Sequence, residues 1–479
     1  RGLRDAAARD GGSGLGVLLS PQLTVEELHL AASLGRGLGT DNIDHRIRQS
    51  DFRAKFSGAP WLGMPIAALA KLESVLLVGS TLRKEQPLVA ARLRGAAKRG
   101  LAVSTVHVAN DELLMPTAAR VVARPGELAA TFAAVAAAVA QATGKTVRGD
   151  LKRAITDEEK AIAASLVGKQ RAAILLGHYA QQHPDFAVLL AIAREIGRIT
   201  GATVGVIPDG ANAVGAHLAG AVPRTGLDAR AMVSSPRRAY LVAGVEAELD
   251  MGPAALAAIA QSEFTVVLSA YRSATTDAAH VMLPIAPFTE TAGTFVNMEG
   301  RVQSFNAVVK GQGESRPGWK VLRMLGSLLE LPGFHAERIE EVRAQIAPDL
   351  AAWPQGRLDN AVAEFDWQIR AAPASLERVA EFAIYAGDPI VRRSPPLQKT
   401  ADMKAARFLR IHPATAAAAG LAVGDRVRVR AGDGEATLAL MPDATLAEGC
   451  VRIARGIPET AALGEGPVSL EKVMESVAA

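Results

Sequence analysis

Short apolar runs alternate with amphipathic stretches along the first part of the chain, and this rhythm constrains the fold more than any other feature. It predicts strands over residues 16–20, 74–80 and 102–109 and helices over residues 24–38 and 86–100. At the start of the first helix, Thr24 precedes Glu27 by three residues, which is the spacing of a capping box. Strand, helix and strand in this order predict a parallel sheet covered by helices.

The rhythm pauses at a polar connector, residues 142–160, and then restarts. Further apolar runs predict strands over residues 172–180, 202–210, 238–246, 264–271 and 280–287. A helical period of apolar residues runs through Phe186, Leu189, Leu190, Ala193 and Ile196. Two more helices are expected around residues 321–329 and 339–346. The sequence therefore predicts an α/β fold with two doubly wound units, residues 1–150 and residues 151–346.

The end of the chain has a different texture. Residues 347–400 are richer in proline, tryptophan and charge and lack a clear period, so they are predicted to be a partly ordered linker. From Phe408 onward apolar and polar residues alternate around Gly432, Asp433 and Gly434, which is typical of a β-hairpin. Residues 401–479 are therefore predicted to form a small C-terminal β domain.

Length and composition exclude several classes of protein. The chain has 479 residues, beyond the roughly 250 to 300 at which single cores stop growing, so two or three domains are expected. Its 53 basic and 49 acidic residues are interleaved, and a net charge of +4 does not imply nucleic acid. The most apolar run, residues 128–140, is too short for a membrane span of about 20 residues, so no direct membrane insertion is expected. The chain starts with arginine instead of methionine, so we expect it to be a portion of a longer protein.

Several motifs favour a structural interpretation. The glycines of residues 11–16 precede a strand instead of joining a strand to a helix, which argues against a dinucleotide loop. Residues 144–146, "GKT", lack the upstream glycine of a P-loop. The histidines are scattered, at positions that include His45, His107, His178, His183, His280, His335 and His412. The pair closest in sequence, His178 and His183, lacks the spacing that places two ligands on one helix face, so no metal site is expected.

The only cysteine, Cys450, excludes an intramolecular disulfide and an all-cysteine zinc or iron–sulfur site within this chain. No G-x-S-x-G nucleophile motif is present. Cys450 lies within an alternating β pattern, so it is predicted to be a buried structural thiol.

The segment "TETAGTFVNMEGRVQ", Thr289 to Gln303, is unusually rich in polar and turn-forming residues. It follows a predicted strand, and doubly wound folds bind ligands at the carboxyl ends of their strands. Within it, two short strands are expected on either side of a turn that contains Gly300, flanked by Glu299 and Arg301. These charged residues either fix the turn or contact a bound group, and the structural role is favoured.

The same segment resembles the E-x-x-G-T-x-x-N-x-E-G-R-x-Q motif of the molybdopterin-dependent oxidoreductase superfamily, which includes formate dehydrogenases and periplasmic nitrate reductases. The stretches "GLGTDNIDHRIRQSDF", "GSTLRKEQPLVAARLR" and "RPGWKVLRMLGSLLELPGF" are similar to the G-subunit family of bacterial proton-translocating NADH:quinone oxidoreductase, respiratory complex I. The resemblance covers most of the chain and is weakest over residues 347–400. It implies two central α/β units of that fold and a C-terminal domain similar to its β-barrel.

The resemblance also implies cofactors and a role. In the G-subunit family, 2Fe–2S and 4Fe–4S clusters are held by an N-terminal cysteine-rich region, which would precede Arg1. Active superfamily members bind molybdenum through a cysteine, selenocysteine, serine or aspartate, and Cys450 does not match that position. A non-catalytic scaffold without molybdopterin is therefore expected, with no catalytic and no metal-binding residue in this portion. The motif residues that match the family are Glu290, Gly293, Thr294, Asn297, Glu299, Gly300, Arg301 and Gln303.

Membership of complex I implies other peripheral-arm subunits as partners and a peripheral place on the cytoplasmic side of the bacterial inner membrane. The chain would then be part of an oxidoreductase without being catalytic by itself. Two alternatives stay open from the residues: an active molybdopterin-dependent oxidoreductase of the formate dehydrogenase or nitrate reductase type, and a non-enzymatic module that binds a small molecule.

Overall fold

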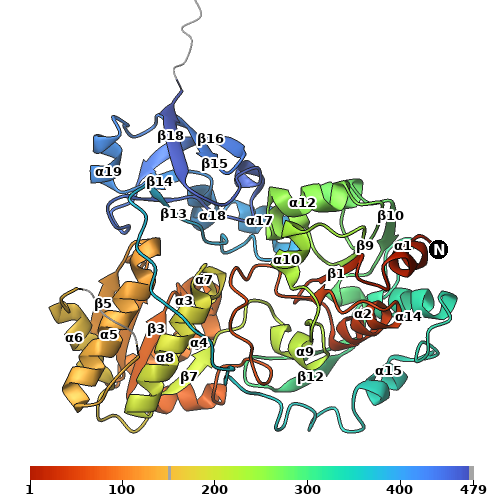
Figure 1. Cartoon of the computed structure of the whole chain (residues 1–479), viewed down its shortest axis with the longest axis horizontal. Helices are drawn as coiled ribbons and strands as arrows, with labels where there is room; N and C mark the ends of the chain where they lie inside the picture. Colours follow the sequence, from red (N-terminus) through yellow and green to blue (C-terminus); the bar gives the residue numbers. More distant parts are fainter. Residues whose placement is uncertain (149–152, 474–479) are drawn as a thin grey trace, which may run out of the picture. The chain divides into compact units, whose positions relative to one another are not determined.

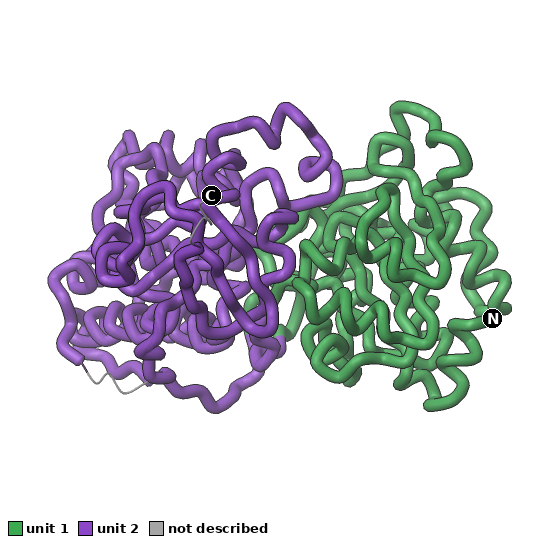
Figure 2. The backbone as a smooth tube through the Cα atoms, turned by 90° about the horizontal axis from the view of Figure 1, so that it is seen from above, with its two compact units in different colours: residues 1–49, 56–61, 208–361 green, residues 50–55, 62–207, 362–479 purple. Residues whose placement is uncertain are grey.

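The computed structural model describes residues 1–148 and 153–473, and the chain forms two compact units. Unit 1 contains residues 1–49, 56–61 and 208–361, and unit 2 contains residues 50–55, 62–207 and 362–479 (Figure 2). The chain passes between the units several times, so each unit is assembled from segments that are distant in sequence.

Unit 1 contains a five-stranded parallel sheet with the strand order β10-β9-β8-β1-β2. Figure 1 labels β1, β9 and β10 of this sheet. Its strands are β1 (Leu15–Leu19), β2 (Ile43–Asp44), β8 (Ala239–Ala243), β9 (Phe264–Ser269) and β10 (Val281–Pro284). Every residue of β1 and β8 is buried, because a parallel sheet is covered on both faces and its strands are therefore apolar throughout. A separate antiparallel pair, β11 (Gly293–Val296) and β12 (Val302–Phe305), confirms the hairpin predicted in the polar segment.

Helix α2 follows β1 and begins with the predicted capping box. The Thr24 hydroxyl accepts a hydrogen bond from the Glu27 amide (3.3 Å), and the Glu27 carboxylate accepts one from the Thr24 amide (2.8 Å). Helix α2 packs against α14, α15 and β11. The helices of unit 1 are α1 (Gly2–Arg9), α2 (Val25–Gly37), α9 (Ala213–Leu218), α10 (Ala229–Ser234), α11 (Ala247–Asp250), α12 (Pro253–Ala260), α13 (Ala274–Asp277), the short 3-10 helix η3 (Phe288–Glu290), α14 (Gly318–Leu328) and α15 (Ile339–Ile346).

Unit 2 contains a second five-stranded parallel sheet, with the order β5-β4-β3-β6-β7. Its strands are β3 (Ser74–Val78), β4 (Ala102–His107), β5 (Ala119–Val122), β6 (Ala172–Leu176) and β7 (Thr203–Val206). The helices and 3-10 turns of this part are η1 (Ile66–Lys71), α3 (Leu82–Glu85), α4 (Pro87–Ala97), η2 (Pro125–Glu127), α5 (Leu128–Thr143), α6 (Asp157–Leu166), α7 (His178–Gln182) and α8 (Phe186–Thr200).

Residues 125–143 form a helix that is long and apolar enough to cross a membrane by length and composition. Its most apolar window is 61% buried within the protein, because α5 packs against α6 and α8 and contacts β4 (Figure 1). Burial of this kind is typical of the core helix of a globular unit.

The C-terminal part of unit 2 is a six-stranded mixed sheet with the order β13-β17-β14-β16-β15-β18. Its strands are β13 (Glu377–Val379), β14 (Leu409–Ile411), β15 (Arg426–Ala431), β16 (Gly434–Pro442), β17 (Cys450–Arg452) and β18 (Val468–Lys472). The remaining helices are α16 (Pro389–Arg392), α17 (Pro395–Gln398), α18 (Ala401–Ala406), α19 (Pro413–Ala418) and the 3-10 turn η4 (Pro458–Thr460). Antiparallel pairing of β15 with β16 confirms the predicted hairpin.

Two expectations differ from this topology. The α/β units are not the consecutive stretches 1–150 and 151–346, because β1 pairs with β8 and β3 pairs with β6. The expected boundary itself lies among residues 149–152, which are outside the described residues. Residues 347–400 are also more than a linker, because they supply β13, which pairs with β17.

Candidate functional site

Three loops of unit 2 leave the carboxyl ends of neighbouring parallel strands. Strand β3 ends at Val78, β4 at His107 and β6 at Leu176. From β3 the chain builds β4 and β5 on one side of the sheet and then β6 and β7 on the other side. The strand order therefore reverses between β3 and β6, and doubly wound folds bind ligands at such a switch point.

An arginine of the C-terminal sheet lies among carboxylates at this edge. The side chain of Arg452 is 7% exposed, and it pairs with both oxygens of Asp111, with Nη1–Oδ1 and Nη2–Oδ2 distances of 3.0 and 2.8 Å. Its Nε atom lies 3.3 Å from Glu381, and its Nη1 atom lies 3.6 Å from Asp443. Asp443 has a second cationic partner, Arg410, at 2.8 Å. The pairs join the α/β part of unit 2 to its C-terminal sheet.

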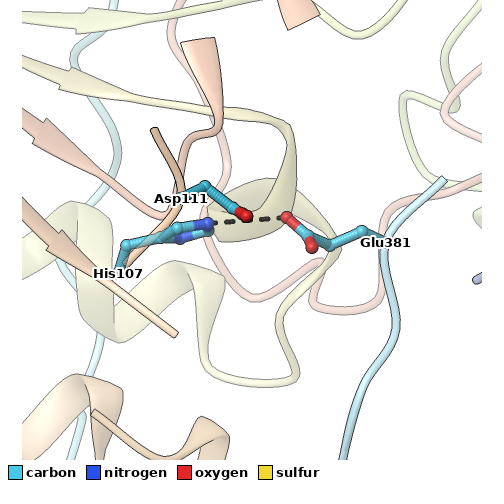
Figure 3. A group of neighbouring side chains, drawn as sticks. All are labelled: His107, Asp111 and Glu381. Atoms are coloured by element: carbon cyan, nitrogen blue, oxygen red, sulfur yellow. Dashed lines mark ion pairs between the residues drawn. The ribbon is translucent and has the colours of Figure 1, made fainter. Parts of the chain in front are cut away.

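A hydroxyl and an imidazole complete this group. The Thr81 hydroxyl oxygen lies 3.0 Å from His107 Nε2, 3.1 Å from Glu381 Oε1 and 3.3 Å from Asp111 Oδ2. Because the hydroxyl donates its single proton to a carboxylate, it accepts a hydrogen bond from the Nε2–H group of His107. Figure 3 shows the side chains of His107, Asp111 and Glu381 pointing toward one another. We call Thr81, His107, Asp111, Glu381, Arg410, Asp443 and Arg452 the Arg452 cluster.

Opposite charges decide the protonation of the cluster. Burial raises the pKa of Glu381, but the charge of Arg452 and the hydrogen bond from His107 outweigh it and bring the pKa down to about 2. Burial likewise acts against ionisation of Asp111, and Arg452 holds the pKa of Asp111 well below its usual range. For Arg452, burial lowers the pKa, but Glu381 and Asp111 raise it above its ordinary value. Asp111, Glu381 and Arg452 therefore stay charged across the neutral range.

His107, Asp111 and Glu381 form a group in the described part of the chain whose ligand atoms, all within 4.8 Å of one another, could hold a metal ion. A divalent cation there would stand beside the guanidinium of Arg452, which already pairs with both carboxylates. Two like charges at such distances repel strongly in a buried place. The donor set therefore favours an internal ion-pair cluster over a metal centre. No local sequence pattern indicates this ion-pair cluster, because Asp111 and Arg452 are 341 positions apart.

The polar hairpin of unit 1 is tied down by a buried carboxylate. Thr294 is fully buried, and Glu26 of α2 accepts hydrogen bonds from its amide (2.9 Å) and its hydroxyl (2.7 Å). The same carboxylate pairs with Arg343 of α15 at 2.7 Å. Thr294 thus has a packing role that connects β11 with two helices. The sequence gives no reason to single out Glu26 or Arg343, because a charged residue on a helix usually faces water.

Asn297 organises the turn of this hairpin. Its side-chain oxygen accepts hydrogen bonds from the amides of Glu299 (3.0 Å) and Arg301 (2.9 Å), which is the pattern of an Asx turn. Arg301 also pairs with Glu299 at 2.9 Å, although its side chain is 67% exposed. Gly300 has a φ of +83°, and a Cβ atom there would lie 2.3 Å from Leu358. These contacts favour the interpretation in which the charged residues fix the turn.

The other motif residues have local roles. A Cβ atom on Gly293 would lie 2.1 Å from Thr24, so only glycine fits against the start of α2. Glu290 accepts a hydrogen bond from the amide of Gln312 (3.2 Å), and Gln303 is exposed on β12. The structure thus places the motif residues in one hairpin and its flanks.

Among the described residues near this hairpin, Glu27 has a strongly shifted pKa. Burial raises its pKa to about 7, against hydrogen bonds from Thr24 and Gly318 that lower it. A Cβ atom on Gly318 would lie 2.4 Å from the Glu27 carboxylate, so α2 and α14 meet closely here.

The two histidines noted in the sequence, His178 and His183, form hydrogen bonds that fix the backbone around them. His183 Nε2 donates to the Pro125 carbonyl (2.9 Å) and its Nδ1 accepts from the Asp185 amide (3.0 Å), so both ring nitrogens are occupied. The strand predicted over residues 172–180 ends at Leu176, and His178 begins α7. Its backbone amide donates to Glu85 (3.2 Å).

Cys450 has the predicted structural character. The residue is fully buried in β17, and burial, followed by the charge of Glu377, raises the pKa of its thiol to about 12. A protonated thiol is a poor nucleophile and a poor metal ligand.

Comparison with known families identifies two regions. The family described as molybdopterin oxidoreductase matches residues 6–328, and the molydopterin dinucleotide binding domain matches residues 391–471. Acetylene hydratase from Pelobacter acetylenicus has a similar structure, with a TM-score of 0.65 and 15% sequence identity over 97% of this chain and 83% of that one. This likeness confirms the expected fold.

Relatives in sequence carry the name of the G subunit of NADH-quinone oxidoreductase. The chain is 28% identical to that of Mycobacterium tuberculosis, over 88% of this chain and 54% of the relative. It is 29% identical to that of Streptomyces coelicolor, over 89% of this chain and 56% of the relative. The chain thus spans about half the length of these relatives, and the resemblance to the G-subunit family is confirmed. Together with the matched domains at both ends, these comparisons show that the chain belongs to the molybdopterin oxidoreductase family.

Proposed function

We propose that the chain is the molybdopterin-oxidoreductase-like portion of the G subunit of a proton-translocating NADH:quinone oxidoreductase, respiratory complex I. Similarity to known G subunits over 88% of the chain is the observation that carries this proposal. In the complex, the chain would lie in the peripheral arm on the cytoplasmic side of the bacterial inner membrane. Its partners would be other peripheral-arm subunits, and the iron–sulfur clusters would be held by a region upstream of Arg1.

Within that complex, we propose a non-catalytic role for this portion. A pterin dinucleotide brings phosphate groups, which need cations or free N–H groups at the loops that receive them. At the switch point of unit 2, the cation Arg452 is already paired with Asp111 and Glu381. Added phosphates would face those carboxylates. The residues therefore do not fit the cofactor at this place.

This chain also has no suitable cysteine to bind the molybdenum of such a cofactor. Cys450 is buried inside β17 with a thiol whose pKa is raised to about 12, so it does not supply the thiolate that binds molybdenum. This supports a scaffold over the alternative of an active molybdenum oxidoreductase.

A scaffold role agrees with the construction of the two units. Electron transfer between clusters needs fixed distances, which a closely packed protein body maintains because native interiors resist deformation. Both parallel sheets have fully buried central strands, β1 and β8 in unit 1 and β3 and β6 in unit 2. This portion would hold the cluster-bearing region and present docking surfaces.

The test is purification of the natural protein through an affinity tag, under conditions that preserve membrane complexes. We expect other complex I subunits and NADH dehydrogenase activity to co-purify, together with iron. Metal analysis is expected to find no molybdenum or tungsten in stoichiometric amount. Either metal at about one per chain would establish the active oxidoreductase instead, and a chain that purifies without partners would contradict membership of the complex.

A further inference from the structure

The switch point of unit 2 contains a carboxylate from the chain itself. Glu85, the last residue of α3, accepts a hydrogen bond from the Thr81 amide (2.9 Å) at Oε1. At Oε2 it accepts one from the Ser80 hydroxyl (2.7 Å) and one from the His178 amide (3.2 Å). Ser80 and Thr81 follow β3, and His178 follows β6, so one carboxylate joins the loops of the two strands between which the order reverses.

This set of donors is of the kind that binds a phosphate group. Backbone amides and a hydroxyl that converge from loops at the carboxyl ends of parallel strands are the usual phosphate ligands of doubly wound folds. Ser80 is 2% exposed and Thr81 is 4% exposed, so their polar groups are withdrawn from water and need an acceptor. Here the acceptor is a side chain that follows four residues after Thr81.

The two loops also pack closely against each other. A Cβ atom on Gly177 would lie 2.3 Å from Ser80 Cβ, and one on Gly79 would lie 2.7 Å from the Ala180 amide nitrogen. The Ala180 amide donates to the Gly79 carbonyl (3.0 Å), so the loops are bonded directly to each other. A phosphate could reach the donors only if the Glu85 carboxylate were gone.

Neighbouring negative charge also opposes the binding of a phosphate while Glu85 is in place. The hydroxyl of Thr81 contacts the carboxylates of Asp111 and Glu381, so a second anion placed beside Glu85 would be close to like charges. Lys84, the basic residue next in sequence, is paired with Asp402 at 3.3 Å. The site therefore takes one anionic group, and the adjacent Lys84 is already paired with another carboxylate.

We propose that this switch point is a self-liganded phosphate site, in which the Glu85 carboxylate takes the place of a phosphate group and excludes phosphate-bearing ligands. The inference rests on the proposed function in that unit 2 is taken to be a scaffold, and it names the residue that closes the site. Glu85 acts by occupying the donors and by holding the β3 and β6 loops together.

Titration of the 479-residue chain with sodium pyrophosphate, followed by calorimetry and phosphorus NMR, tests the proposal. Repulsion by Asp111 and Glu381 acts in every variant, so the expected result is a difference between variants. Glu85→Ala should bind pyrophosphate at least about tenfold more tightly than the wild-type chain does, a difference in binding free energy of about 1.4 kcal/mol. Adding Ser80→Ala to Glu85→Ala should weaken pyrophosphate binding again, because it removes one donor.

The matched control is Glu73→Ala. The Glu73 carboxylate also accepts a backbone amide, that of Gln170 (3.1 Å), but it precedes β3 and lies at the opposite end of the sheet. Glu73→Ala removes the same charge and should not create pyrophosphate binding. Equal binding by both variants, binding by the wild-type chain as tight as by Glu85→Ala, or a folded Glu85→Ala without binding would overturn the proposal.

A second measurement covers the case in which Glu85→Ala does not fold. In Glu85→Gln the amide group cannot accept all the hydrogen bonds, so hydrogen exchange of the Thr81 and His178 amides should accelerate at least about tenfold. Exchange of the Gln170 amide should stay as in the wild-type chain. Unchanged exchange at Thr81 and His178 would overturn the proposal. Failure of the complex I assignment is detected separately, by the metals and subunits that co-purify.

Discussion

The guanidinium of Arg452 pairs with both carboxylate oxygens of Asp111, at 3.0 and 2.8 Å, although 341 positions separate the two residues in sequence. Arg452 ends a strand of the C-terminal sheet, and Asp111 follows β4 of the parallel sheet. The contact therefore joins two layers of unit 2 at the edge where doubly wound folds bind ligands.

Removal of this cation should destabilise unit 2. Arg452→Ala leaves the partly buried carboxylates of Asp111 and Glu381 without their main partner, and breaking a buried pair costs up to about 3–5 kcal/mol. Urea denaturation followed by circular dichroism measures the change in the free energy of unfolding.

Arg428→Ala is the control for this prediction. Arg428 is partly exposed on β15 and pairs with Glu471 at 3.3 Å, so its removal should cost less than about 1 kcal/mol. Equal losses for the two variants would show that burial of the Arg452 pairs is unimportant.

Acid should weaken the same cluster. Glu381 has a pKa of about 2 in the folded chain, lower than the ordinary 4.5, so its contribution to stability is complete above about pH 4.5. That contribution is lost as the pH falls from about 4.5 to about 2. Urea denaturation at about pH 6, 4 and 3 should show a smaller loss for Glu381→Gln than for the wild-type chain. Parallel losses would contradict the depressed pKa.

Glu27 should produce the opposite dependence. Its pKa is raised to about 7 in the folded chain, so the stability that its protonated form gives is complete below about pH 4.5 and is lost as the pH rises through about 7. In Glu27→Gln, the free energy of unfolding should fall less between about pH 5 and pH 8. Glu340→Gln removes a carboxylate that is 61% exposed on α15 and controls for net charge. A wild-type slope in Glu27→Gln would refute the assignment.

The stability of the turn in the polar hairpin should depend more on Asn297 than on the ion pair between Arg301 and Glu299. Asn297→Ala removes the acceptor of two backbone amides, and such local hydrogen bonds are worth about 0.5–1.5 kcal/mol each. Arg301→Ala removes an exposed partner of Glu299 and should cost less than about 1 kcal/mol. Thermal denaturation ranks the variants.

The same variants test whether the hairpin is structural. If Glu299→Ala or Arg301→Ala lowered turnover in a complex that is fully assembled and equally stable, the hairpin would have a functional contact instead. We expect any loss to follow reduced stability or assembly.

Local elements could be predicted because their causes are local. The capping box depends on Thr24 and Glu27, three positions apart, and the C-terminal hairpin depends on a turn between adjacent alternating runs. The buried character of Cys450 followed in the same way from its alternating surroundings. Family membership could also be predicted, because the hairpin contains the residues of the family motif. Some of them have a local structural reason, such as Gly293, which packs against Thr24.

The order of the strands could not be predicted, because periodicity shows that a strand is buried and not which strand lies beside it. Pairing of β1 with β8 and of β3 with β6 exchanged segments between the two expected units. For the same reason β13 was missed: three residues in an irregular stretch become a strand only because β17 supplies the hydrogen-bond partners.

By itself the sequence determined the α/β class, the principal helices and strands, the family and the absence of a cysteine cluster within these residues. Only the tertiary structure decided that Arg452 meets Asp111 and Glu381, and that Glu85 joins the loops of β3 and β6. The physical reason is that charges act on whatever folding brings near them. Their partners are set by the packing of distant segments, which no pattern along the chain records.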